Sequence, residues 1–139
     1  MIKYMGLDLG SKTLGLSISE SGIIANNLTT LYFKEHDYEE AVKKMVEVID
    51  QYKITCLVIG YPKHMNNDVG IRAKISEDFK ESILKVRPIE IVLWDERLST
   101  RSAITAMIGQ KQSRSKQKQK KDELAATLIL QNYLDYKRG

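Results

Sequence analysis

The sequence has little cysteine, histidine or proline and no long apolar run. Its one cysteine, Cys56, excludes an internal disulfide and a cysteine-based zinc site, and we expect it to be a small buried hydrophobe. The two histidines, His36 and His64, are 28 positions apart and have no partner at a ligand spacing. A His/Cys metal cluster is therefore excluded, whereas a metal bound by carboxylates is not.

We also expect no targeting segment and no second domain. No apolar run approaches the ~18–20 residues that a membrane span needs. The N-terminus carries Lys3, Gly6 and Asp8 within a short apolar stretch, which is not typical of a secretory signal. The length of 139 residues suits one domain, and no internal repeat is visible. We expect a single cytoplasmic domain over residues 1–139.

The positive charge is concentrated in one segment. The net charge is +4, yet residues 109–121 hold six cations and no acid, and the rest of the chain has 16 basic against 18 acidic residues. This segment has no apolar residue to bury, which predicts a flexible loop. Such a loop suits a phosphate backbone, although a solvated linker is the alternative. The cations are Lys111, Arg114, Lys116, Lys118, Lys120 and Lys121.

Apolar periodicity predicts three strands, followed by alternating helices and strands. Short links between the first three strands predict antiparallel hairpins. Asp37 is a candidate N-cap for the first helix, and Ser99 or Thr100 for a third helix that ends near Ile108. The predicted strands are Ile2–Leu9, Thr13–Ser19, Ile23–Phe33, Thr55–Ile59 and Ile89–Trp94, with a second helix over Val69–Lys85 and a final helix that begins at Asp122.

The predicted order describes an α/β fold with a mixed five-stranded sheet, in which two parallel strands are added beside the first strand. In open sheets of this kind, sites form beyond the strand ends, where the chain direction changes. Acidic residues stand at such places. Asp8 lies near the end of the first strand, and Asp95 and Glu96 follow the fifth, while Asp122 opens the final helix.

Clustered carboxylates repel one another unless cations screen them, and ligands that are all oxygen indicate Mg²⁺ or Mn²⁺. Two such ions, about 4 Å apart, activate water and stabilise the leaving oxygen of a phosphodiester. There are structural alternatives. Asp122 would also serve as a plain helix N-cap, and Asp95-Glu96-Arg97 as a surface turn. Asp8 is the hardest to explain structurally, because a carboxylate inside a strand is costly to bury without a partner.

Four motifs, in this order, resemble the YqgF family from Met1 to about Tyr136. They are Gly6-Leu7-Asp8-Leu9-Gly10-Ser11-Lys12 with Gly15, Leu57-Val58-Ile59-Gly60-Tyr61-Pro62 with Asn66 and Gly70, Asp95-Glu96-Arg97-Leu98-Ser99-Thr100, and Asp122-Glu123-Leu124-Ala125-Ala126 with Ile129-Leu130-Gln131. The family is described as Holliday junction resolvases and as nucleases that mature the 5′ end of pre-16S ribosomal RNA.

The resemblance implies a ribonuclease H-like fold and metal-dependent cleavage of phosphodiesters in structured nucleic acid. By that resemblance Asp8, Glu96 and Asp122 are the catalytic, metal-binding acids, and Asp95 is a further metal ligand. We expect Mg²⁺ or Mn²⁺ as cofactor. Lys12, Arg97 and the basic segment are the candidates for binding phosphates.

The sequence departs from the family pattern at three places. Thr13 stands where an arginine is usual, and Glu20 where an aspartate is frequent. Thr13 removes a fixed cation from the first loop, so Lys12, Arg97 or the basic segment must take its place. Gly60 stands where better-known junction resolvases have an acid, so the acid set depends on Glu96.

Two other kinds of function compete with a nuclease. One is an actin-like ATPase, whose phosphate loop resembles Asp8-Leu9-Gly10, but that fold needs two lobes. The other is a nucleic-acid-binding factor in ribosome assembly that cuts nothing. The sequence leaves open RNA or junction DNA as the substrate, Mg²⁺ or Mn²⁺, and a monomer or a homodimer.

Overall fold

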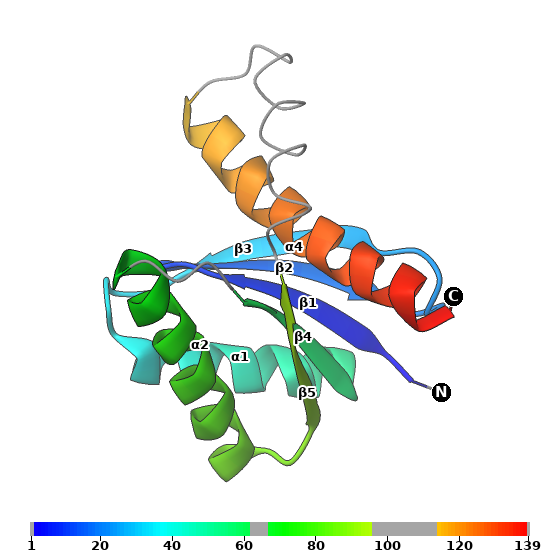
Figure 1. The fold of residues 1–139 in the computed structure, drawn as a ribbon, viewed down its shortest axis with the longest axis horizontal. Coiled ribbons are helices and arrows are strands. Elements are labelled where there is room, and N and C mark those ends of the chain that lie inside the picture. The colour runs from blue at the N-terminus through cyan, green and yellow to red at the C-terminus, as the bar shows by residue number, and fades with distance from the viewer. Residues whose placement is uncertain (1, 62–66, 96–113, 139) are drawn as a thin grey trace.

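A computed structural model describes residues 2–61, 67–95 and 114–138, and shows a mixed five-stranded sheet with helices on both faces (Figure 1). The strand order in the sheet is β3-β2-β1-β4-β5. Along the chain the strands are β1 Tyr4–Leu9, β2 Thr13–Ser19, β3 Asn26–Tyr32, β4 Cys56–Tyr61 and β5 Glu90–Asp95. β1 is therefore the central strand.

The pairing confirms the sheet expected from the sequence. β1 pairs antiparallel with β2, and β2 pairs antiparallel with β3. On its other side β1 pairs parallel with β4, which pairs parallel with β5. The carboxyl ends of β1, β4 and β5 therefore meet at one edge of the sheet. β3 starts later than expected, because Ser21 hydrogen-bonds the backbone N–H groups of Ile23 and Ile24 and holds them in the preceding turn.

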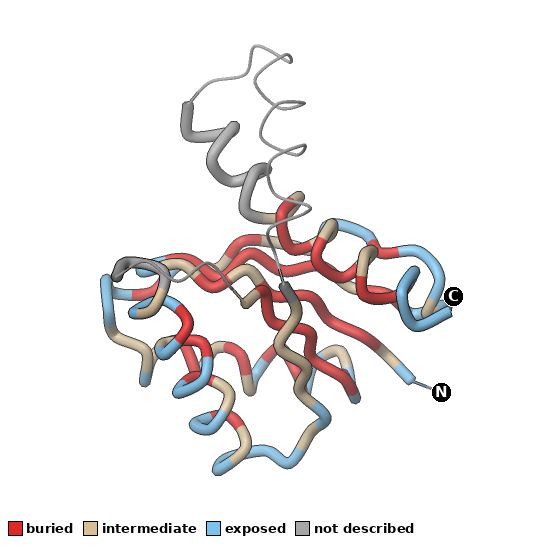
Figure 2. Tube along the Cα trace, in the orientation of Figure 1, coloured by how far each residue is buried: buried red, intermediate tan, exposed pale blue. Residues whose placement is uncertain are grey.

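One face of the sheet is covered by α1 (Tyr38–Tyr52) and α2 (Asn67–Val86). Asp37 caps α1 as predicted, since its side chain accepts a hydrogen bond from the backbone N–H of Glu40 at 3.2 Å. Apolar residues from both helices and from alternate strand positions form the larger core, in which Leu7, Ile59 and Phe79 are buried. Figure 2 shows this burial along the strands and along the inner side of the helices.

The opposite face is covered by α4 (Arg114–Arg138), which packs across β1, β2 and β3. A second apolar cluster lies beneath it and includes Cys56, Val58 and Ile129. Gly6 makes the close approach possible. A Cβ at this position would lie 2.4 Å from Oγ of Ser17, 2.6 Å from the carbonyl oxygen of Ala126 and 2.8 Å from Cβ of Leu130.

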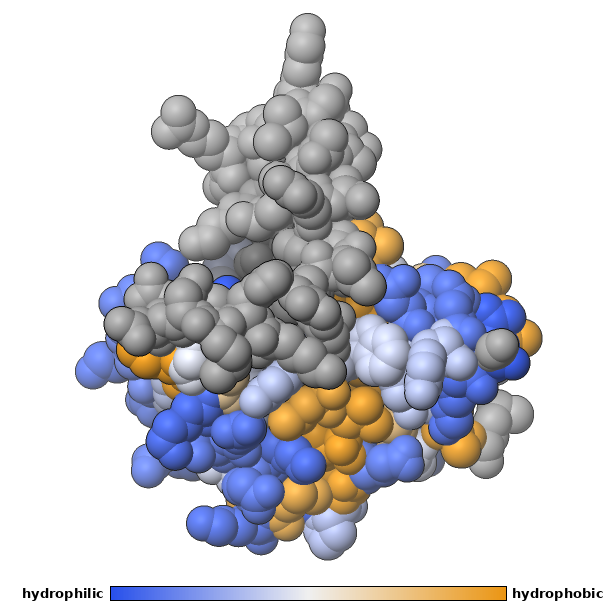
Figure 3. Space-filling model, in the orientation of Figure 1, coloured by the Kyte–Doolittle hydropathy of each residue, from blue (hydrophilic) through white to orange (hydrophobic). Residues whose placement is uncertain are grey.

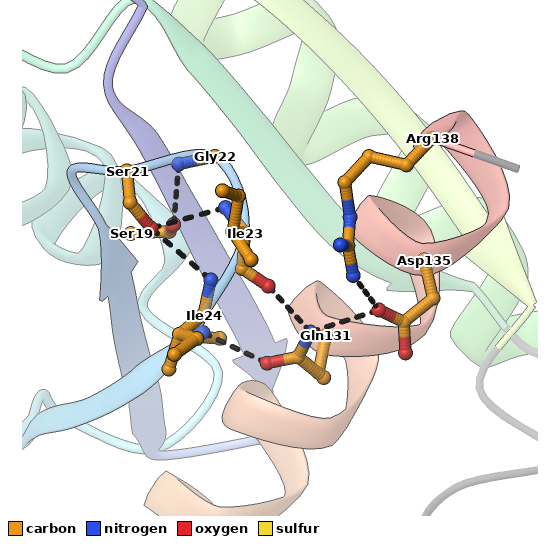
Figure 4. Close-up of polar contacts among 9 residues, drawn as sticks. Ser19, Ser21, Gly22, Ile23, Ile24, Gln131, Asp135 and Arg138 are labelled. Atoms are coloured by element: carbon orange, nitrogen blue, oxygen red, sulfur yellow. Dashed lines mark hydrogen bonds and ion pairs between the residues drawn. The ribbon is translucent and has the colours of Figure 1, made fainter.

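The C-terminal half of α4 is also tied to the connection between β2 and β3 (Figure 4). The Gln131 side chain accepts a hydrogen bond from the backbone N–H of Ala25 at 2.9 Å and donates one to the carbonyl of Ile23 at 2.8 Å. One side-chain amide thus satisfies two backbone groups of a turn. This contact, with the Gly6 approach, fixes how α4 is placed along the sheet.

The start of α4 corrects two predictions. One was a final helix that begins at Asp122, and the other was a flexible loop over the basic segment. The helix begins at Arg114, so Arg114, Lys116, Lys118, Lys120 and Lys121 are helical and do not form a loop. The segment lacks apolar residues, but lysine, arginine and glutamine are good helix formers. Extending a helix that is already anchored by packing costs far less than starting one. Residues 109–113 and the expected third helix lie outside the described residues.

β5 is the edge strand, and its apolar residues Ile91–Trp94 are only half-buried. Figure 3 shows apolar surface in the lower middle of this view, where Figure 1 places the start of β5. Trp94 packs edge-on against Tyr133 of α4, with 5.5 Å between the ring centroids. Among the described helices none is long and apolar enough to cross a membrane.

Candidate active site

A row of residues crosses the sheet on the α4 face at the level of Asp8. Asp8 is paired with Gly15 of β2, which is in turn paired with Thr30 of β3. On the other side Leu7 is paired with Ile59, so Gly60 of β4 is level with Asp8. Because side chains alternate along a strand, Asp8 shares the face of Gly6, against which α4 packs.

Asp8 is therefore a half-buried carboxylate with a glycine on each neighbouring strand. Neither glycine fills the space beside it with a side chain. A carboxylate in such a place is costly unless a cation or hydrogen-bond donors stabilise its charge. A bound cation at Asp8 would meet that need, which makes Asp8 a candidate site residue.

Two contacts place the middle of α4 above this row. The Ser17 hydroxyl donates a hydrogen bond to the carbonyl of Ala126 at 2.8 Å. Ser17 is paired with Gly6, which lies two residues before Asp8 in β1. At the outer end of the row, the Thr30 hydroxyl donates to Oε2 of Glu123 at 3.3 Å. Residues 123–126 of α4 therefore cross the sheet close to the level of Asp8.

The structure describes some of the predicted acids in more detail than others. Asp122 lies in the third turn of α4, one residue before Glu123, so the alternative of a helix N-cap is wrong. Asp95 is the last residue of β5 and is paired with Tyr61. Glu96 lies outside the described residues, and so do the side chains of Asp95 and Asp122. Among the side chains that the structure describes, no three His, Cys, Asp or Glu form a metal-binding group.

The predicted phosphate-binding cations divide in the same way. Lys12 is exposed in the hairpin between β1 and β2, at the edge where the parallel strands end. Arg97 and Lys111 lie outside the described residues. Arg114, Lys116, Lys118, Lys120 and Lys121 lie in the first turns of α4, which project past the sheet in Figure 1.

Cys56 takes no part in the site, as expected. It is a free thiol, 1% exposed, in the cluster under α4. Burial raises the pKa of the Cys56 thiol to about 12, and the charge of Glu90 and a 3.5 Å contact with its carboxylate add to that rise. A thiol held protonated in this way is neither a nucleophile nor a metal ligand at neutral pH.

Sequence reasoning missed a pocket on the other face of the same edge. It has a volume of about 420 Å³ and is lined by Gly10, Gly60, His36, Arg72 and Ser76, among others. The one signal in the sequence was Ser76, a polar residue next to the apolar positions of α2. Nothing in the sequence brings residues 36 and 72 together, because they come from separate elements.

The fold and the acidic residue of the central strand define a ribonuclease H-like protein. Two solved structures share this fold. Thermus thermophilus RuvC, in complex with a Holliday junction substrate, has a TM-score of 0.60 and 14% identity, over 100% of this chain and 97% of that chain. The human cytomegalovirus terminase nuclease domain has a TM-score of 0.55 and 13% identity, over 96% and 82%.

The family model RuvX, described as Holliday junction resolvase, matches residues 2–136. The chain belongs to this RuvX family, also called YqgF, which confirms the resemblance of its motifs. A relative from Onion yellows phytoplasma, named "Putative pre-16S rRNA nuclease", is 53% identical over 95% of this chain and 88% of its own length. A relative of the same name from Staphylococcus aureus is 44% identical, over 96% and 95%. The chain is thus an enzyme of the nuclease class.

Proposed function

We propose that this nuclease hydrolyses phosphodiesters in structured nucleic acid with the help of divalent metal ions. Its substrate is the 5′ end of pre-16S ribosomal RNA or a four-way DNA junction, in the cytoplasm. The observation that carries the proposal is Asp8, which stands in a row of glycines under α4. Family membership supports the same chemistry, since curated relatives are named for an RNA substrate and the family for a DNA substrate.

The donors fit Mg²⁺ or Mn²⁺. All of the candidate ligands are carboxylates, and these ions prefer oxygen ligands. Asp8, Glu96 and Asp122 would hold the metal, with Asp95 as a further ligand. Bound ions of this kind supply an activated water and stabilise the leaving oxygen.

The register of α4 supports the pairing of Asp8 with Asp122. Going up β1, Tyr4 lies beside Tyr133, and Gly6 lies against Leu130 and Ala126. The helix therefore runs antiparallel to β1. Two strand residues advance by about 6.6 Å, and four helix residues by about 6 Å. Continued by one step of four residues from Ala126, this register favours a place for position 122 near position 8.

Basic residues would hold the substrate backbone on either side of the acids. Lys12 at the sheet edge, with Arg97, would take the place of the cation that Thr13 removes. Arg114, Lys116, Lys118, Lys120 and Lys121, together with Lys111, would contact more distant phosphates. These contacts bind and orient the strand but carry no direct base information.

The test is a cleavage assay with the wild-type chain and Mg²⁺ or Mn²⁺. Substrates are a pre-16S leader RNA, a four-way DNA junction and a linear duplex DNA. We expect cleavage of the leader RNA or the junction, with 5′-phosphate and 3′-hydroxyl ends, and none after chelation of the metal. If both metals leave all of the structured substrates intact while the protein still binds them, a non-catalytic ribosome-assembly factor is the better description.

A further inference from the structure

The pocket beyond the ends of β1 and β4 lies at a change of direction in the sheet. After β1 the chain turns into β2 on one side, whereas after β4 it passes through α2 to β5 on the other. A crevice at such a point, outside the carboxyl ends of parallel strands, is the usual ligand site of open α/β sheets. Its volume of about 420 Å³ falls within the usual range for small-molecule sites.

The wall of the pocket has an apolar part and a cationic part. Tyr38 of α1 and Ile75 of α2 form apolar walls, and the backbone of Gly10 and Gly60 closes the end nearest the sheet. Arg72 brings positive charge, His36 adds an imidazole, and no carboxylate lines the pocket among the described residues. Burial raises the pKa of the Tyr38 phenol, the charge of Arg72 lowers it, and the charge of Glu35 raises it.

Ser76 is the feature that packing alone does not explain. This residue is 5% exposed and lines the pocket, yet its hydroxyl makes no hydrogen bond to any residue that the structure describes. A buried hydroxyl without a partner costs free energy, so it is expected to have one in the working state. A ligand with acceptor oxygens, bound between Ser76 and Arg72, would supply it.

We propose that this pocket binds one nucleotide of the substrate strand next to the cleavage site. Its phosphate lies at Arg72 and Ser76, and its base lies against Tyr38 and Ile75. The inference rests on the proposed function. The pocket is next to the proposed cleavage site, because Leu9, which lines the pocket, directly follows Asp8 in β1. A strand that passes over the sheet edge would thus meet the acids on one face and the pocket on the other. Arg72 provides the positive charge on the pocket wall.

The first test is an NMR titration of the intact chain with AMP, adenosine and inorganic phosphate. AMP should shift the amide signals of Gly10, Ser11 and Ser76, and it should bind more tightly than either fragment. Arg72→Gln should weaken AMP binding about tenfold, as expected for loss of a charge-assisted hydrogen bond. Ser76→Ala should weaken it about threefold, since one neutral hydrogen bond is lost.

Lys74→Gln is the matched control. Lys74 is on the same helix and exposed, it pairs with Asp78 at 3.7 Å, and it does not line the pocket. Its substitution removes the same charge and should change AMP affinity by less than about twofold. Equal losses in Arg72→Gln and Lys74→Gln, or shifts confined to another surface, would overturn the proposal.

The second test measures binding of a short single-stranded oligonucleotide to Asp8→Asn protein, which removes cleavage from the measurement. Adding Arg72→Gln should weaken this binding about tenfold, and adding Lys74→Gln should not. If Arg72→Gln weakens AMP alone and leaves the oligonucleotide unaffected, the pocket serves free nucleotides and the strand proposal is wrong. Both tests report on the pocket without cleavage, so they stand or fall separately from the nuclease assay.

Discussion

Single residues decide how closely α4 approaches the candidate site. Gly6 lies in β1 where a Cβ would overlap Oγ of Ser17 and the Ala126 carbonyl. We expect Gly6→Ala to destabilise the protein by about 2–3 kcal/mol, because backbone atoms of α4 would have to move. Urea denaturation measures this. The Gly6→Ala substitution should also lower the rate of cleavage, since α4 carries Asp122.

Gly70 gives the control for this substitution. It lies in α2, and a Cβ there would meet no atom within 4 Å. Gly70→Ala should therefore stabilise the protein by about 0.5–1 kcal/mol through better helix propensity. Equal behaviour of the two variants would mean that the Gly6 approach does not hold α4 in place.

Cys56 gives a second prediction at this scale. Its buried thiol, with a pKa raised to about 12, should not react with a disulfide reagent at pH 8 until the protein unfolds. Because the folded state holds this proton more tightly than the unfolded state, its stabilising effect is complete below about pH 9. The effect is lost as pH rises from about 9 to 12. Rapid labelling of the native protein would contradict the burial.

At the scale of elements, the sequence predicted the sheet better than the last helix. β2 matches its predicted bounds, and the Asp37 cap fixed the start of α1. These elements have a clear apolar period or a local cap, and each packs along its whole length. The first turns of α4 have neither signal, so charge alone suggested a loop. Their helical state depends on continuity with the packed half of α4, which is not visible in a short window.

A helical basic segment sharpens the prediction about nucleic acid. Replacing Lys111, Arg114, Lys116, Lys118, Lys120 and Lys121 by Gln should preserve α4, because glutamine is also a good helix former. The affinity for nucleic acid should fall whatever its nucleotide sequence. The wild-type slope of log affinity against log salt, about −3 to −5, should flatten toward zero. Fluorescence anisotropy at several salt concentrations measures the slope, and the melting temperature should barely change.

A matched variant removes the same charge elsewhere. Lys34, Lys43, Lys53, Lys74, Lys85 and Arg87 are exposed and lie outside α4. Their replacement by Gln should leave the salt slope close to that of the wild type. If the two six-fold variants behave alike, the protein binds through its net charge and α4 has no special role.

At the scale of the whole molecule, the candidate site depends on long-range packing. The sequence placed Asp8 near the end of a strand and Asp122 on a helix. It did not show which part of the helix lies against which part of the strand. That register comes from Gly6, Ser17 and Gln131, whose partners in space lie more than 100 positions away. The pocket at Arg72 was missed for the same reason, because its walls come from four separate segments.

The central claim is that Asp8 holds the metal used for cleavage, and Asp8→Asn tests it most directly. The substitution keeps the shape of the side chain and removes its charge, so the melting temperature should stay near that of the wild type. Mn²⁺ binding measured by calorimetry should be lost, and cleavage of the structured substrate should fall by about two orders of magnitude or more. Asp50→Asn, at an exposed carboxylate that pairs with Arg87, should leave Mn²⁺ binding and cleavage unchanged. Full cleavage by a folded Asp8→Asn protein would contradict the account.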